Sequence, residues 1–538
     1  MKKTYSVLLF VLILVFLVCM TSVFVACNKK DTDSASTHLH KYNTEEIVQN
    51  PTCTENGIKK YYCDSCDSEL IEVIPALGHD LDNNNTCRRC GATDATQGFE
   101  LELLDNGTYT IKAYSGTKTN LAVPSVYNGA AITRIESQAF LGCSGLSSLV
   151  VPNSIVTIDK GAFNGCGGLR SIVLPFVGGG DPTGSSGTFS SRTFNYRTFG
   201  FIFGSDTYEG STNVEQSYGG YSFGWKIPSN LTSVSITGGE LFDCSFIGCS
   251  MLTNVNLPNN ITSIPQHCFD CCTSLETIIL PKTVESIGDY AFLRCEKLES
   301  IYIGPKVEHI GNQVLAITNS LKEIVVDGDN AVYNSRGNCL IETASKTIIK
   351  GCNNSVVLAD DDILVIADDA FSACTFTGTV VIPNSVIQIG RNAFNGCNLT
   401  TVTILRGIQR LEDGIFEGCS NLTTVLLSDG LKVIGNRAFQ SSAIESIVIP
   451  DGVESIYHQV FCDCQNLTTV TIPASVIYLE MDVFLASPNL RDIYFGGTKE
   501  QWMSYCNGVE AFGPMKTFEN WKSYPDTCIV HCLDGDIK

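Results

Sequence analysis

Apolar residues recur along most of the chain with a period of 22 or 23 residues. In one copy, residues 275–281 read LETIILP, residues 284–287 read VESI, and Ala291 and Phe292 follow. The alternation of apolar and polar positions predicts a short strand over 275–280, and Pro281 ends it because proline cannot donate to a strand ladder. Residues 284–287 predict a second extended segment, and Ala291-Phe292 predict a turn.

Each unit of this pattern has too few apolar residues to close a core by itself. Stacked units bury these residues in one continuous column, so the pattern predicts a β-rich solenoid of short strands. The phenylalanine of the turn marks the period. It recurs at Phe140, Phe163, Phe223, Phe246, Phe269, Phe292, Phe371, Phe394, Phe416, Phe439, Phe461 and Phe484, and Leu315 takes its place once.

Many of the 25 cysteines share a single phase of the repeat, three residues after the phenylalanine. A fixed phase in a solenoid is a fixed place in its cross-section. We therefore expect these cysteines to lie inside the column as reduced, inert side chains rather than as metal ligands. The set is Cys143, Cys166, Cys249, Cys272, Cys295, Cys374, Cys397, Cys419 and Cys464.

The skeleton AFxxCxxLxxVxIPxSVxxIG resembles the BspA-type leucine-rich repeat of bacterial and protozoan surface proteins, and it recurs from about residue 99 to 496. The resemblance implies a right-handed array of short parallel strands and, in some members, adhesion to host proteins or to other microbes. We expect the solenoid to span 95–496, with an insertion at 177–225 and a long unit at 316–370. A hairpin around Asn106-Gly107 would cap its start, and a closing segment would cover 497–538.

The first 27 residues read as a secretory address. Lys2 and Lys3 precede an uncharged apolar stretch over 5–26, and the sequence FVAC at 24–27 resembles a bacterial lipobox. The resemblance implies lipidation of Cys27 and attachment to the extracellular face of the cell membrane. The apolar stretch is also long enough for an uncleaved membrane-spanning helix. Residues 28–37 are polar and predict a short tether.

Residues 38–94 form a module of different composition, with two Cys-x-x-Cys pairs 20 residues apart. Such pairs bring sulfur atoms to one point, and two pairs complete a tetrahedron suited to Zn²⁺. The module also resembles zinc-ribbon-like repeats of secreted bacterial proteins. We expect Zn²⁺ to be held by Cys63, Cys66, Cys87 and Cys90.

Other residues of the module leave alternatives open. Cys53, His79 and one of His38 or His40 could form a second site or replace ligands of the first. Disulfides are a rival interpretation because the segment is extracellular, and free thiols are a third. The spacing points to a structural metal, because no nearby base marks an open catalytic position.

The net charge and the absence of catalytic motifs argue against two classes of function for this chain, nucleic-acid binding and catalysis. The net charge is -21, and without the first 27 residues 33 basic residues face 56 acidic ones. Such an acidic surface repels phosphate backbones, so nucleic acid is not an expected partner. No phosphate-binding loop, zinc-protease motif or nucleophile elbow occurs in the sequence. We therefore do not expect an enzyme.

The insertion at 177–225 combines aromatic residues with glycine, serine and threonine, a mixture typical of contact surfaces. The alternative is that its rings pack on one another. The candidate binding residues are Phe194, Tyr196, Tyr208, Tyr218, Tyr221 and Trp225.

The sequence thus favours a non-enzymatic cell-surface protein that binds an extracellular protein or glycan. Two alternatives are a passive envelope lipoprotein and an accessory of extracellular polysaccharide degradation.

Overall fold

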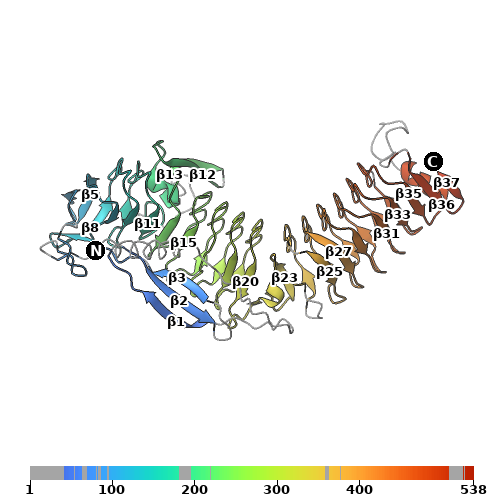
Figure 1. Ribbon diagram of the computed structural model, residues 1–538, viewed down its shortest axis with the longest axis horizontal. Helices are drawn as coiled ribbons and strands as arrows, with labels where there is room; N and C mark the ends of the chain where they lie inside the picture. The colour runs from blue at the N-terminus through green and yellow to red at the C-terminus, as the bar shows by residue number, and fades with distance from the viewer. Residues whose placement is uncertain are drawn as a thin grey trace, which may run out of the picture.

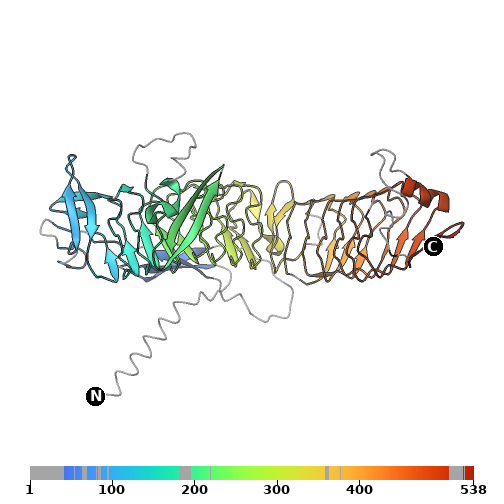
Figure 2. The ribbon, with the colours of Figure 1, turned by 90° about the horizontal axis from the view of Figure 1, so that it is seen from above.

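The computed structural model describes residues 42–507 and 525–537, apart from 54, 64–68, 75, 80, 83–85, 94–95, 181–195, 219, 358–362, 376, 481 and 526. The described chain confirms the predicted fold class, since it forms a β-solenoid of mostly parallel strands. Two arms meet at an angle near β23, whereas from above they follow one line (Figures 1 and 2). We call residues 99–326 the N-terminal arm and residues 363–537 the C-terminal arm.

The strand of the Leu-x-x-Ile-x-Leu segment recurs in nearly every coil and forms the first strand row, in which neighbours pair in parallel. Its members in the N-terminal arm are β6 (Asn120–Ala122), β9 (Ser148–Val150), β11 (Ser171–Leu174), β14 (Ser233–Ile236), β15 (Asn254–Asn256), β18 (Ser300–Ile303) and β20 (Glu323–Val326). Its members in the C-terminal arm are β25 (Gly378–Ile382), β27 (Leu399–Ile404), β29 (Thr424–Leu426), β31 (Ser446–Val448), β33 (Thr469–Ile472), β35 (Asp492–Phe495) and β36 (Ile529–Cys532).

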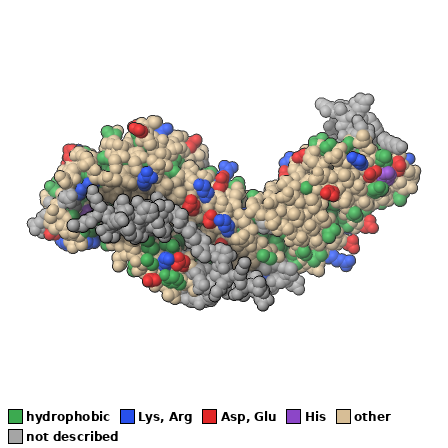
Figure 3. All heavy atoms as spheres, in the orientation of Figure 1, with side chains coloured by type: hydrophobic (Ala, Val, Ile, Leu, Met, Phe, Trp, Pro, Cys, Tyr) green, Lys and Arg blue, Asp and Glu red, His purple; other side chains and the backbone are tan. Residues whose placement is uncertain are grey.

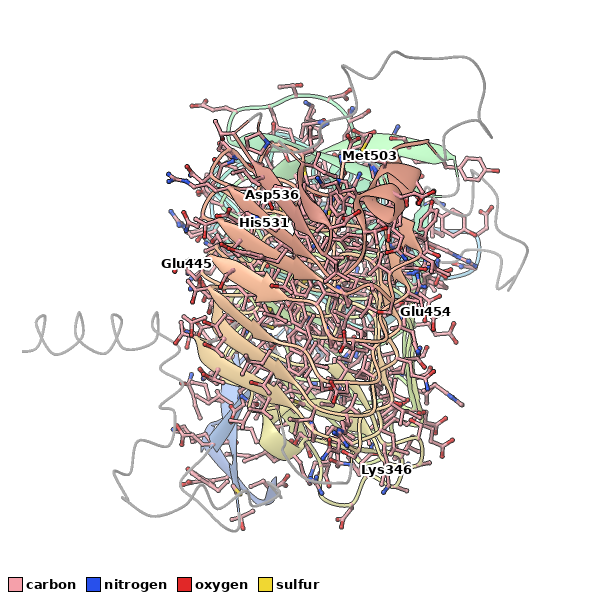
Figure 4. All side chains as sticks on the ribbon, turned by 90° about the vertical axis from the view of Figure 1, so that its right-hand side faces the viewer. Lys346, Glu445, Glu454, Met503, His531 and Asp536 are labelled. Carbon is pink, nitrogen blue, oxygen red and sulfur yellow. The ribbon has the colours of Figure 1, made fainter. Side chains whose placement is uncertain are left out.

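The second extended segment of each coil forms a parallel row of very short strands on the opposite side of the solenoid. In Figure 4, Glu445 and His531 lie on the side of the first row and Glu454 lies on the other. The second row contains β10 (Thr157–Ile158), β16 (Ser263–Ile264), β17 (Ser286–Ile287), β19 (His309–Ile310), β24 (Val365–Ile366), β26 (Gln388–Ile389), β28 (Arg410–Leu411), β30 (Val433–Ile434), β32 (Ser455–Ile456) and β34 (Tyr478–Leu479).

The repeat phenylalanines form a stacked column inside the solenoid. Phe269 and Phe292 lie with ring centroids 5.4 Å apart and planes within 3°, and Phe371 and Phe394 lie 5.0 Å apart within 7°. Each of these rings is fully buried. The backbone N–H of each phenylalanine donates to a carbonyl of the next coil, as Phe371 does to Ala393 at 2.7 Å. The column therefore carries the core, as the fixed phase predicted.

The cysteines that follow the phenylalanines also lie inside, except Cys143, which is half-buried. Several of their thiols reach back one coil. Cys295 Sγ donates to the Phe269 carbonyl at 3.3 Å, and Cys397 Sγ donates to the Phe371 carbonyl at 3.0 Å. Burial raises the pKa of Cys419 to about 12. These cysteines are inert because a buried thiol with a raised pKa forms no thiolate at neutral pH.

The insertion changes the column in a way the period did not predict. The 3-10 helix η1 (Phe199–Phe203) supplies the rings between Phe163 and Phe246, since Phe203 lies 6.1 Å from Phe163 and Phe199 lies 5.2 Å from Phe246. Phe223 is therefore not a column residue, and assigning it to the column was wrong. It lies half-buried on the hairpin of β12 (Ser211–Tyr218) and β13 (Tyr221–Pro228).

The long unit carries a second hairpin at the bend. It contains β21 (Tyr333–Asn334), the 3-10 helix η2 (Arg336–Asn338), β22 (Leu340–Glu342) and β23 (Thr347–Lys350). β23 then pairs in parallel with β24 and restarts the second row. Here the buried core divides into two clusters, one for each arm.

Both ends of the array are covered. At the start, β4 (Phe99–Leu103) and β5 (Tyr109–Tyr114) form the predicted antiparallel hairpin, followed by β7 (Val126–Tyr127) and β8 (Ala130–Ile135). Gly107 has φ +78° in its turn, a conformation that glycine adopts readily. At the finish, α3 (Lys499–Asn507) and the hairpin of β36 with β37 (Gly535–Ile537) close the array. These caps leave less of the terminal strand edges open.

Candidate metal centre and binding face

The N-terminal module brings four metal-binding side chains to one point. They are Cys53, His79, Cys87 and Cys90, whose candidate ligand atoms all lie within 4.8 Å of one another. The first three are buried and Cys90 is exposed. Their three thiols and one imidazole form the Cys₃His donor set that structural Zn²⁺ sites use.

Local backbone pairing explains why these residues meet. The Leu77 and Gly78 N–H groups donate to the Thr52 and Cys53 carbonyls, which places the segment before His79 beside Cys53. Cys87 and Cys90 lie on one tight turn, in which the Gly91 N–H donates to the Cys87 carbonyl at 2.8 Å. Gly91 has φ +73°, so this turn uses the glycine that follows the second cysteine.

The distances fit a tetrahedral ion. With metal–sulfur bonds of about 2.3 Å and metal–nitrogen bonds of about 2.0 Å, ligand atoms lie about 3.8 Å (S···S) and about 3.5 Å (S···N) apart. Cys53 Sγ lies 3.7 Å from Cys87 Sγ, and Cys90 Sγ lies 3.4 Å from His79 Nδ1. Burial and the neighbouring thiols raise the pKa of Cys53 to about 12, and a bound cation would favour its thiolate form.

The structure groups the ligands differently from the first expectation. Cys87 and Cys90 belong to the cluster, but Cys63 ends β2 (Gly57–Cys63) and packs with Tyr302 and Val325 of the solenoid. Among the described residues, the group that could hold a metal ion therefore contains Cys53 and His79 beside Cys87 and Cys90, and Cys63 is not part of it. Cys66, His38 and His40 lie outside the described residues.

In the sequence, Cys53 and His79 are only alternative ligands, because no spacing motif marks them. Neither Cys53 nor His79 belongs to a Cys-x-x-Cys pair, and two equal pairs looked complete by themselves. What the sequence does not display is the pairing of Leu77 and Gly78 with residues 52–53, which positions both ligands. The alternative in which Cys53 and His79 replace ligands of the first site is the one that matches the observed group.

The module also covers one face of the solenoid. Its sheet consists of β1 (Tyr42–Gln49), β2 and β3 (Glu69–Ile74), and it lies along the N-terminal arm (Figure 1). Ala76 packs with Ala122, Val150 and Val173, which are outward residues of the first strand row. At the other end of the sheet, the Lys282 ammonium lies 5.7 Å from the Tyr61 ring centroid.

The strand register places the covered residues in a line that continues through the array. Val150 pairs with Val173, and Tyr302 pairs with Val325. We call this outward line the N-terminal face, and its residues are Ala122, Val150, Val173, Ser235, Asn256, Tyr302 and Val325. The two apolar pairs are between 2 % and 6 % exposed, although they point away from the solenoid core.

The same line in the C-terminal arm is uncovered. Val381 is 38 % exposed, Leu426 55 %, Val448 65 % and Tyr494 46 %. We call this line the C-terminal face, and its residues are Val381, Thr403, Leu426, Val448, Thr471, Tyr494 and His531. Figure 3 looks onto this side and shows hydrophobic side chains among polar ones on the C-terminal arm. The arrangement is a flat strip of aliphatic side chains, threonines, one tyrosine and one histidine.

Two aromatic residues in the described part of the insertion pack against the protein itself. Trp225 is 1 % exposed and stacks on Phe223 with ring centroids 5.7 Å apart, which differs from the expectation of a contact residue. Tyr208 is half-buried, and its hydroxyl donates to the Lys226 carbonyl at 2.7 Å.

The other candidates of the insertion are placed unevenly. Tyr196 and Tyr221 are half-buried. Tyr218 lies in β12, where only its backbone is described, and Phe194 lies outside the described residues.

Cys27 also lies outside the described residues, so its lipidation stays a prediction. Within the described part of the chain, the search for a helix long and apolar enough to cross a bilayer finds no candidate.

Comparisons with solved structures give leucine-rich repeat proteins of bacteria. A leucine-rich cell surface protein of Faecalibacterium prausnitzii is 21 % identical, with 78 % of this chain and 97 % of that chain covered and a TM-score of 0.43. A leucine-rich repeat protein of Bacteroides ovatus is 18 % identical, with 81 % and 99 % covered and a TM-score of 0.37. The pneumococcal vaccine antigen PcpA is 16 % identical, with 75 % and 86 % covered and a TM-score of 0.35.

A search of curated proteins gives no match. The family described as the BspA type leucine-rich repeat region matches residues 107–191, 219–339, 342–468 and 387–510. These segments span most of the solenoid and well over half of the chain. The protein therefore belongs to the BspA-type leucine-rich repeat family.

Proposed function

We propose that this protein is a non-enzymatic cell-surface protein that binds an extracellular protein through its C-terminal face. The observation that carries the proposal is the uncovered line of Leu426, Val448 and Tyr494 in a solenoid that covers the same line elsewhere. Exposed apolar side chains that gather on one face are typical of interaction surfaces.

The chemistry of the strip favours a protein over a glycan. Adjacent parallel strands lie about 4.8 Å apart, so seven strands present a flat strip roughly 30 Å long. Its aliphatic side chains suit the apolar residues of a protein, whereas the hydroxyl groups of a sugar lose hydrogen bonds with water on such a surface. The flanking Thr424 and Ser446 are exposed and supply hydrogen-bonding hydroxyl groups at the edge.

A structural Zn²⁺ in the module completes the proposal. Cys53, His79, Cys87 and Cys90 would hold the ion, and the fit of their distances supports this assignment. The ion would replace the hydrophobic core that a module of this size lacks. Metal analysis of the purified protein tests it, and a stoichiometry near zero contradicts it.

Lipidation of Cys27 would hold the chain at the extracellular face of the membrane. The lipobox-like sequence before Cys27 supports this part of the proposal. Mass spectrometry of the mature N-terminus tests it. A diacylglyceryl cysteine as the first residue is expected, and a chain that begins at Met1 contradicts it.

The binding test uses the chain without its first 27 residues on an array of extracellular-matrix proteins, bacterial surface proteins and glycans. A double variant, Leu426→Asp with Val448→Asp, places two charges on the C-terminal face. Ile477→Asp is the matched control, because Ile477 is 75 % exposed on the same arm but precedes β34 of the second row.

We expect saturable binding to a protein that is lost in the double variant and kept in Ile477→Asp. Binding to glycans alone contradicts the choice of a protein ligand. Silence across the array favours the passive envelope role, and turnover of a polysaccharide favours the accessory role.

A further inference from the structure

One segment of the module touches both the metal ligands and the solenoid. Residues 76–79 run from β3 toward the first coils, and we call them the strap. On the solenoid side, the Ser125 hydroxyl donates to the His79 carbonyl at 2.9 Å, and His79 forms a parallel bridge with Pro124. On the metal side, the His79 imidazole lies beside Cys90.

The turn that carries Cys87 and Cys90 is hydrogen-bonded to the same strap. Arg89 lies between Cys87 and Cys90 in sequence, and its guanidinium donates to the Leu77 and Gly78 carbonyls at 3.2 Å and 3.1 Å. Ligand positions and the docking segment are therefore parts of one small unit. A change in the metal site must move the segment that attaches the module to the solenoid.

The rest of the described interface is thin. Outside the strap it consists mainly of one small apolar contact at Tyr61 and Cys63, and Ala76 of the strap makes a second one. Between these two contacts lies a cavity of about 720 Å³ under β2 and β3, bordered by both apolar and polar residues of the solenoid. The Asn259 amide reaches Glu72 there only at 3.5 Å. The strap thus contributes a large share of what positions the sheet.

The module has little else to hold the strap in shape. Among its described residues, the buried apolar cluster consists of Cys53, Leu81 and Cys87, with Ala92 against it. Two of these three are themselves candidate ligands. A segment with so small a core needs the metal to fold, so removal of the ion should release the strap.

We propose that the metal bound by Cys53, His79, Cys87 and Cys90 is a clamp that keeps the module docked over the N-terminal face. With the ion bound, Val150, Val173 and Tyr302 stay covered. Without it, the module detaches and exposes them, so that the N-terminal arm also presents an uncovered strip. The effect of the clamp on ligand binding rests on the proposed function. Docking and release of the module do not, because both can be measured without a ligand.

Two tyrosines provide the test. Tyr302 in β18 and Tyr494 in β35 hold the same position in their coils, yet they are 5 % and 46 % exposed. Hydroxyl-radical footprinting with mass spectrometry measures the oxidation of both in one sample of the full chain. Oxidation is measured in three samples of the protein: with one equivalent of Zn²⁺, after addition of a chelator, and after Zn²⁺ has been added back.

We expect the chelator to raise Tyr302 oxidation toward that of Tyr494, by a factor approaching roughly nine, the ratio of 46 % to 5 %. Zn²⁺ should reverse this increase. Oxidation of Tyr494 should stay constant. The buried ring of Phe292 should stay protected, which shows that the N-terminal arm remains folded. Zinc binding with unchanged Tyr302 oxidation overturns the clamp, and absence of zinc binding overturns the site itself.

Two variants separate the ion from the protein contacts. Cys90→Ser removes the exposed ligand, so Tyr302 should be oxidised rapidly at any Zn²⁺ concentration. Cys271→Ser removes a thiol of the solenoid surface and should behave as the wild type. Protection of Tyr302 in Cys90→Ser without bound zinc contradicts the clamp. These outcomes are independent of the array, on which the C-terminal face is tested by other substitutions.

Discussion

The two arms of the solenoid share a core and differ in what covers them. In both arms the phenylalanine rings stack inside, and valine and tyrosine recur at the same outward position of the first strand row. In the N-terminal arm this line lies under the module, and in the C-terminal arm it faces solvent. Burial of these residues is therefore decided by a segment outside the repeat.

This difference shows what a repeat sequence determines. The phase fixes which residues enter the column, because each coil must bury its own apolar residues against its neighbours. The outward line is free of this requirement, so its exposure depends on a separate docking event. Tyr302 and Tyr494 illustrate the point, since both follow an isoleucine of the first row but only Tyr302 is covered.

The largest effect should come from the shared column. Phe292→Ala in the N-terminal arm and Phe394→Ala in the C-terminal arm each remove a fully buried ring. Each should lower the free energy of unfolding of its arm by about 3–5 kcal/mol through lost burial and a cavity. Chemical denaturation checks this, with half-buried Phe223→Ala as a milder control. A clearly larger cost in one arm would break the claim that both arms share one core.

Opposite effects are expected at equivalent outward positions. Val173→Asp buries a carboxylate under Ala76, which should cost about 1–3 kcal/mol or release the module. Val448→Asp places the same group in solvent, so the stability should change by no more than about 0.5 kcal/mol. Footprinting of Tyr302 and thermal unfolding measure the two outcomes. Equal effects of both variants would mean that the C-terminal face is covered as well.

The sequence predicted the architecture well, because the column repeats one phase many times and each copy supports the others. It predicted the metal site less well. Cys63 and Cys53 are both cysteines of a short module, and only the pairing of the strap with residues 52–53 distinguishes them. Likewise, the period assigned Phe223 to the column, whereas η1 supplies Phe199 and Phe203 by a fold of the chain that has no counterpart in the repeat.

A smaller effect concerns the thiols behind the rings. Cys397→Ala removes the donor to the Phe371 carbonyl, whereas Cys397→Ser keeps a donor of similar size. Another coil has a serine at the equivalent position, since the Ser487 hydroxyl donates to the Phe461 carbonyl at 2.8 Å. We expect the serine variant to be about 1 kcal/mol more stable than the alanine variant in denaturation. The same order at Cys166 in the N-terminal arm would sharpen the claim of a common core, and a reversed order there would contradict it.

The smallest effect lies at the end of the C-terminal face. His531 bonds to Asp492 and Asp536 at 3.0 Å each, and its ring stacks on Tyr494. The hydrogen bond to Asp492 raises the pKa of His531 above its ordinary value. A raised pKa in the folded state stabilises the protein below the unfolded-state pKa of about 6.5, and this stabilisation is lost as pH rises through the folded-state value.

The hairpin of β36 and β37 should therefore open more easily at pH 8.5 than at pH 6, by less than about 1 kcal/mol because the ion pairs lie at the surface. Hydrogen exchange of residues 529–537, corrected for the intrinsic effect of pH, measures this opening. His531→Gln should abolish the difference. If the pH difference in hairpin opening persists in His531→Gln, another titrating group causes it, and the titration of His531 does not affect the hairpin.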